Sequence, residues 1–152
     1  MKYSEILGTK LKSDFLIDLF ETYDADVVYV YDRNYEGMND EYRASIPDMG
    51  LEFLFNKDQS LTTLFMSQIE HDGHNPFAGP DPRKPKYNTI QEAVAYANKA
   101  GIDFQHQEER IDSFFGMTPE WVKFNLNDYS IHYQFNNAGV DTVTLQMPSH
   151  TN

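Results

Sequence analysis

The order of apolar and polar residues along the chain predicts a helix followed by β-strands, and this order occurs twice. In the first half, apolar residues at helical spacing follow Ser13, a residue type that caps helix N-termini, and the pattern ends near Asp24. Residues 27–31 then form a run of valine and tyrosine, which favours a strand. The segment 32–48 is polar and acidic and contains a glycine and a proline, so a long loop is expected there.

A β-hairpin is expected to complete the first half. Leu51, Phe53 and Phe55 alternate with other residues, which predicts a strand with one strongly apolar face. Residues 61–66 follow a polar turn and are expected to return as the antiparallel partner of this strand.

The second half repeats the order after a segment rich in proline. Residues 73–86 contain four prolines and predict a linker. Thr89 and Glu92 have the spacing of a capping box, and Gly101 is suited to the left-handed position that ends a helix. The strands expected after this second helix begin at residue 102 and then cover 121–126, 129–135 and 140–147, with a loop before Pro119.

The two halves show similar patterns when their hairpins are aligned at an offset of 80 residues (131 minus 51). The aligned pairs are Leu51 with Ile131, Phe53 with Tyr133 and Phe55 with Phe135; one extra residue in the second turn then aligns Leu64 with Leu145 and Met66 with Met147. The alternative is that the similarity does not reflect duplication, because any two hairpins show such alternation. We predict a single α+β domain over 1–152, with pseudo-repeats at about 11–70 and 87–148 and a linker at about 73–86. The repeats would form one sheet with both helices on one face.

The sheet face away from the helices is expected to be polar and aromatic. It would present Glu52, His132 and Gln134, together with Leu54, because these residues alternate with the apolar positions of the hairpins. Such a surface is suited to contact rather than to catalysis.

The charge of the chain is strongly negative. Asp and Glu number 24 against 12 Lys and Arg, which gives a net charge of −12. This charge repels nucleic acid and anionic membranes, and it attracts basic partners with raised association rates. The sequence has neither a secretory signal pattern nor an apolar run near the roughly 20 residues of a membrane span, and it has no cysteine. We therefore expect a cytoplasmic protein with no nucleic-acid or membrane partner.

No motif of catalysis is found along the chain. His71, Asp72 and His74 are the densest set of metal-binding residue types, but the neighbouring glycine and Asn75-Pro76 indicate a turn. Close carboxylate pairs are expected by chance among 24 acids. We expect no enzymatic activity, no metal and no cofactor.

The acidic residues of the first half form a candidate binding surface. Ten acids lie between Asp14 and Asp48, opposed only by Arg33 and Arg43, and tyrosines are interleaved with them. Carboxylates supply steering and charge-assisted bonds, and tyrosines supply rigid contact area. The alternative is a solvated helix face with tyrosines in the core. The predicted partner-binding residues are Asp24, Asp26, Tyr29, Tyr31, Asp32, Tyr35, Glu36, Asp40, Glu41, Glu52 and His132.

The duplicated pattern resembles the architecture of the β-lactamase inhibitory protein, in which tandem helix-plus-sheet units form a concave sheet that grips an enzyme. The chain differs from that secreted, disulfide-bonded inhibitor in having neither a signal pattern nor cysteine. It is also similar to small bacterial immunity proteins of polymorphic and contact-dependent toxin systems. The segments that show this similarity are 7–14, 26–29, 50–55 and 129–135.

The resemblance implies a protein that is monomeric when free and that neutralises a toxin by binding it. Its partner would be a basic toxin domain, such as a nuclease, whose active site it covers. No inhibitory residue is carried over by a motif, so the residues proposed for binding are chosen by charge and exposure. The alternative is a non-catalytic module that binds a small ligand or another protein through the uncovered sheet face.

Overall fold

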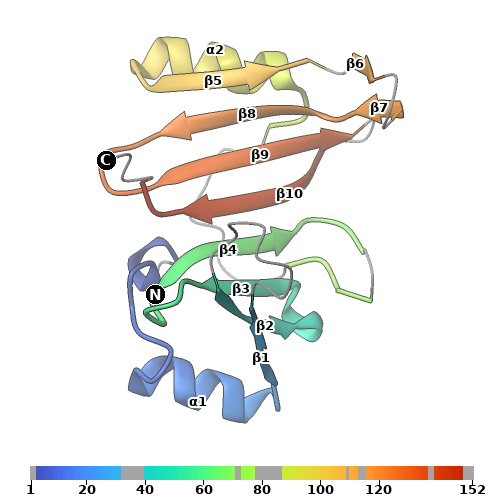
Figure 1. Cartoon of the computed structure of the whole chain (residues 1–152). Helices are drawn as coiled ribbons and strands as arrows, with labels where there is room; N and C mark the ends of the chain where they lie inside the picture. The colour runs from blue at the N-terminus through green and yellow to red at the C-terminus, as the bar shows by residue number, and fades with distance from the viewer. Residues whose placement is uncertain are drawn as a thin grey trace.

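The computed structural model describes residues 3–31, 40–70, 73–77, 87–108, 110–112, 116–136 and 139–148. Within these ranges, eight strands form one antiparallel sheet in the order β1-β2-β3-β4-β10-β9-β8-β5. Helices α1 (Asp14–Thr22) and α2 (Ile90–Ala100) lie near opposite ends of this order (Figure 1). The predicted α+β class is confirmed, with more strand than helix.

The strands and short helices have the following bounds. The sheet consists of β1 (Val27–Val30), β2 (Glu41–Ile46), β3 (Leu51–Phe55), β4 (Leu61–Ser67), β5 (Asp103–Gln107), β8 (Glu120–Asn125), β9 (Ser130–Asn136) and β10 (Gly139–Gln146). A separate hairpin pairs β6 (Arg110–Asp112) with β7 (Gly116–Thr118), and the 3-10 helices are η1 (Tyr3–Ile6) and η2 (Pro47–Met49).

One face of the sheet is apolar from strand to strand. Residues that pair directly across antiparallel strands share a face, and the register places six buried residues side by side in one row. This row consists of Ala44, Phe53, Leu64, Leu145, Ile131 and Phe124. The predicted alternation of the two hairpins is thus confirmed, and this face is the hydrophobic core.

Both helices cover the core face. The ring of Phe20 on α1 lies 5.1 Å from that of Phe53, and the ring of Tyr96 on α2 lies 6.3 Å from that of Phe124. Since Phe53 and Phe124 belong to the same row, the helices lie on the same side of the sheet, as predicted. The opposite side, called here the outer face, is only half-buried.

Two stretches predicted as loops contain strands. Residues 41–46 within the predicted loop 32–48 form β2, because Tyr42, Ala44 and Ile46 alternate toward the core. The region before Pro119 contains the β6–β7 hairpin. The loop prediction was therefore wrong for these residues, and 32–39 lie outside the described part of the chain.

The first part of the predicted linker 73–86 is attached to the body of the protein. The N–H of Phe77 donates to the carbonyl of Ser67 at 2.7 Å, and the Phe77 ring lies 5.2 Å from that of Tyr3. Gly50 permits this approach: its φ is +67°, and a Cβ there would clash with the carbonyl oxygen of Asn75. Residues 78–86 lie outside the described ranges.

The two halves of the chain meet at the centre of the sheet. From each edge inward the strands follow in chain order, β1 to β4 on one side and β5, β8, β9 and β10 on the other. The final strands β4 and β10 pair with Leu64 opposite Leu145, and both side chains are fully buried. Neither of the described helices is long and apolar enough to cross a membrane.

Candidate functional site

Strand β1 lies at one edge of the sheet and is exposed along its whole length. Among the described strands only β2 pairs with it. Its apolar residues and the tyrosine that follows are far more exposed than those of the inner strands: Val27 41%, Val28 56%, Tyr29 48%, Val30 39% and Tyr31 50%. A contiguous run of exposed valine and tyrosine at a sheet edge is typical of an interaction surface, because water solvates it poorly.

Tyrosines form a layer on the core-side face of this edge. Tyr29 pairs with Tyr42 across the strands with ring centroids 4.9 Å apart, and Tyr31 stacks on Tyr29 at 5.9 Å. The Tyr29 hydroxyl donates to Oδ2 of Asp40 at 2.6 Å. This hydrogen bond to a carboxylate raises the pKa of Tyr29 to about 12, because the bond favours the protonated hydroxyl. The ring is consequently held in place as a fixed contact.

Two predicted acids stand at the start of β1. Asp24 and Asp26 are exposed in the turn between α1 and β1. Asp24 has a φ of +51°, a left-handed conformation that Asp tolerates better than most residues. The N–H of Ala25 donates to the carbonyl oxygen of Phe20 at 2.8 Å and closes the turn. Within the described ranges neither Asp24 nor Asp26 forms an ion pair. Their negative charge is therefore directed to solvent beside the exposed strand.

Two other predicted acids lie on the outer face and share one cation. Arg43 approaches Glu41 at 2.8 Å and Glu52 at 4.0 Å, and its side chain is half exposed. Glu41 and Arg43 alternate with Tyr42, so they point away from the tyrosine layer. The predicted site is thus divided: Tyr29, Tyr31 and Asp40 lie on one face of the edge, and Glu41 and Glu52 on the other.

His132 lies far from β1 on the same outer face as Glu52. Pairing places Glu52, Phe65, Thr144 and His132 on successive strands, so about 14 Å separates Glu52 from His132. The His132 ring stacks on Trp121 at 5.1 Å, and burial lowers its pKa, with Lys123 lowering it further. His132 therefore belongs to a second surface, where its cross-strand neighbour is the cationic Lys123, rather than to the acidic edge.

Several participants were not among the predicted site residues. The acidic run does not indicate Val28, Val30, Tyr42 or Trp121, although the alternation of Tyr42 with Ala44 is a usable signal for a strand. The predicted residues Asp32, Tyr35 and Glu36 lie outside the described part of the chain.

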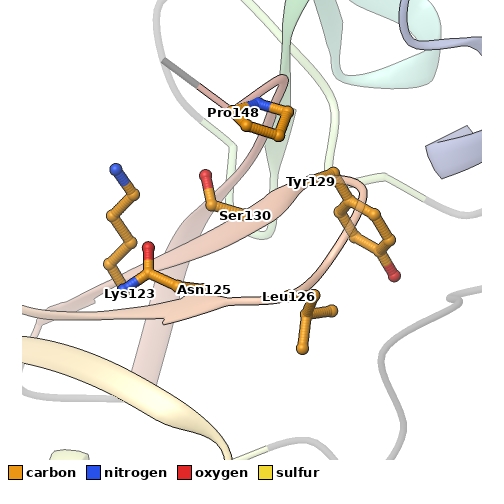
Figure 2. A pocket seen from close by; sticks show the side chains of 6 residues that line it. All are labelled: Lys123, Asn125, Leu126, Tyr129, Ser130 and Pro148. Atoms are coloured by element: carbon orange, nitrogen blue, oxygen red, sulfur yellow. The ribbon is translucent and has the colours of Figure 1, made fainter. Parts of the chain in front are cut away.

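A small cavity of about 180 Å³ opens at the turn between β8 and β9. Figure 2 shows Lys123 and Ser130 pointing to one side of these strands and Leu126 and Tyr129 to the other. The remaining lining residues are Asn125, whose side chain donates to Asp103 at 3.1 Å, and Pro148. This volume is below the roughly 300 Å³ at which small-molecule pockets begin.

Metal-binding side chains are not grouped in the described ranges: no three His, Asp or Glu residues there could hold one ion. His71 and Asp72 lie outside those ranges. In comparisons with known proteins, no family model, curated protein or solved structure matches this chain.

Proposed function

We propose that the protein is a cytoplasmic immunity protein that binds a basic toxin domain, such as a nuclease, and covers its active site. The exposed valine and tyrosine edge of β1 carries this proposal, because an apolar strand so accessible to solvent is best explained by a partner that covers it. The protein itself would not catalyse a reaction. Binding alone would exclude the toxin's substrate.

Charge supports a basic partner. The chain has a net charge of −12, and Asp24 and Asp26 stand beside the exposed strand without ion pairs in the described ranges. A negative surface attracts a cationic domain from a distance and raises its association rate by roughly tenfold to a thousandfold. A toxin that cleaves nucleic acid offers such a cationic cleft.

The tyrosine layer supports contact by fixed aromatic anchors. Tyr29 is held between Tyr42, Tyr31 and the carboxylate of Asp40. A side chain that is already ordered loses little conformational entropy on binding, and tyrosine is enriched among the residues that dominate binding energy.

We also propose that the two halves are copies of one unit. The sequence offset aligns Leu64 with Leu145, and the sheet pairs these same two residues at its centre. In a twofold arrangement, equivalent residues meet at the axis. Each half also runs from a helix to four strands of the main sheet in the same order, with the β6–β7 hairpin as an addition in the second half. A duplicated unit of this kind leaves one continuous outer face.

The test begins by asking whether a large secreted protein with a variable C-terminal domain is encoded directly upstream, and it then measures binding to that domain. Association rates are measured at low and physiological ionic strength with the native chain and with Asp26→Lys. We expect the rate to fall with salt and to fall several-fold in Asp26→Lys, because steering depends on local charge. Asp128→Lys is the matched control, since it changes the net charge equally on the exposed β8–β9 turn. Salt-independent association, or equal slowing by both variants, would contradict the proposal.

A binding module that uses the outer face is the second candidate. The stacked rings of Trp121 and His132 favour it, because they form a half-exposed aromatic surface amid Gln134 and Thr144. In that case Trp121→Ala would weaken binding of the partner, and Asp26→Lys would leave it unchanged.

A further inference from the structure

We infer that the outer edge of β1, meaning the backbone edge that faces away from β2, accepts an extended segment of the partner as an added antiparallel or parallel strand. This segment would be flanked by lysine or arginine. This inference rests on the proposed function and specifies how the basic partner is held. Its starting point is the place of β1 in the sheet: β1 is first in the strand order, and of the described strands only β2 pairs with it.

The backbone of β1 provides the groups that such a strand requires. Its antiparallel register runs from Val27 opposite Ala44 to Val30 opposite Glu41 without a shift. In an antiparallel pair, successive residues direct their N–H and C=O groups alternately toward the partner strand and away from it. Either Val27 and Tyr29 or Val28 and Val30 therefore present these groups at the outer edge. Backbone groups of this kind supply the affinity in strand addition.

The side chains of β1 suit a neighbouring strand on both faces. Tyr29 and Tyr31 lie on the core-side face, and Val28 and Val30 lie on the outer face. β-Branched and aromatic residues are the types that pack best against a cross-strand neighbour. The opposite sheet edge, β5, reads Asp-Phe-Gln-His-Gln and lacks this character. The two edges of one sheet thus differ in their suitability for an added strand.

Charge determines which strand is accepted. Asp24 and Asp26 lie at the N-terminal end of β1, and Asp40 lies across from it beside Tyr29. A second copy of this chain would bring the same acids and another net charge of −12 to the edge, which opposes self-pairing. Lysine or arginine residues flanking an apolar strand would instead complement these carboxylates. The occupant is therefore a cationic strand of the partner.

The test uses a synthetic peptide of alternating valine and threonine flanked by lysines, added to the full chain. Amide hydrogen exchange is followed residue by residue. We expect exchange at alternate residues of β1 to slow by about tenfold or more, because the added strand binds their outward N–H groups. Exchange at β5 should be unchanged. The same peptide with N-methyl groups on the amides that would face β1 keeps its charge, but these methyl groups prevent the two backbones from approaching to hydrogen-bond distance, so it should give no protection.

Two charge variants outside β1 test whether the acids beside this strand select the peptide. Asp26→Lys should weaken the protection severalfold, whereas Asp128→Lys should not. Protection at β5, protection by the N-methylated peptide, or protection that rises with protein concentration in the absence of peptide would each overturn the inference.

The same measurement on the complex with the toxin domain separates the two proposals. If the domain binds with the expected salt dependence but β1 remains unprotected, strand addition is wrong and the proposed function stands. If the peptide protects β1 but no basic toxin domain binds the chain, the edge accepts strands and the proposed function is wrong.

Discussion

His132 shows what the half-buried outer face does to a single titratable residue. Its ring stacks on Trp121, and its neighbours across the strands are Lys123 on β8 and Thr144 on β10. Burial disfavours the charged imidazolium, and the nearby ammonium of Lys123 disfavours it further, so the pKa of His132 is lowered. The neutral ring is therefore the form that stacks at neutral pH.

The lowered pKa of His132 predicts a stability change with pH. The unfolded chain binds this proton more tightly than the folded protein, so the free energy of unfolding should fall as the pH drops below about 6.5. Urea unfolding of the native chain and His132→Gln across this range measures the effect. In His132→Gln, the free energy of unfolding should fall less as the pH drops. His106→Gln, which changes an exposed histidine on β5, should retain the full decline; if both variants behave alike, the assignment to His132 is wrong.

The alternation of side chains explains why the candidate site was only partly predictable. The acidic run identified Asp24, Asp26, Asp40 and Glu41 by composition, which contains no information on faces. Once residues 41–46 form a strand, Glu41 must point opposite to Tyr42 and hence away from the tyrosine layer. Acids that are close in the sequence, such as Asp40 and Glu41, therefore lie on opposite faces of the sheet edge.

The starts of the two helices differ although the sequence predicted an N-cap for both. Thr89 accepts a hydrogen bond from the N–H of Glu92, and the Glu92 carboxylate reaches back to the N–H of Asn88 at 2.8 Å. Ser13 makes no capping bond, and its hydroxyl is buried without a partner in the described part of the chain. Only the second cap is functional.

Replacing each cap with alanine should therefore have unequal effects. Thr89→Ala should lower the free energy of unfolding by about 1 kcal/mol, because it leaves an N–H of the first turn without its partner. Ser13→Ala should be neutral or slightly stabilising, because it removes a buried hydroxyl that makes no hydrogen bond. Urea unfolding at constant pH measures both. Equal losses in the two variants would show that Ser13 caps its helix in solution.

The strands were predicted best where one face is strongly apolar. The segments around Phe53 and Tyr133 show apolar residues at every second position, and both became strands. Residues 41–46 follow the same period with Tyr42 and Ala44, but the polar residues of the surrounding segment obscured it. The β6–β7 hairpin lies outside the main sheet, where the pattern of a shared core gives no guidance.

At the scale of the molecule, the pairing of β4 with β10 makes one sheet of two halves. Leu64 and Leu145 meet there, both fully buried in the core face. Each half alone would expose the edge of its last strand, and its part of the apolar row would lose the neighbouring residue from the other half. Folding of either half should therefore depend on the other, and the molecule should unfold as one unit.

Leu64→Ala tests this coupling with a reporter in the other half. Trp121 is the single tryptophan of the chain and lies on β8, with β10 and β9 between it and β4. Removing the Leu64 side chain should lower the free energy of unfolding by about 2–5 kcal/mol, because it leaves a cavity in the core. If the halves are coupled, Trp121 fluorescence and far-ultraviolet circular dichroism should shift to the same lower denaturant midpoint. Val28→Ala is the control, since a side chain 56% exposed at the sheet edge should change the midpoint little. A fluorescence transition that stays at its native midpoint while the dichroism shifts would mean that the second half folds alone, and the central pairing would then join two independent units.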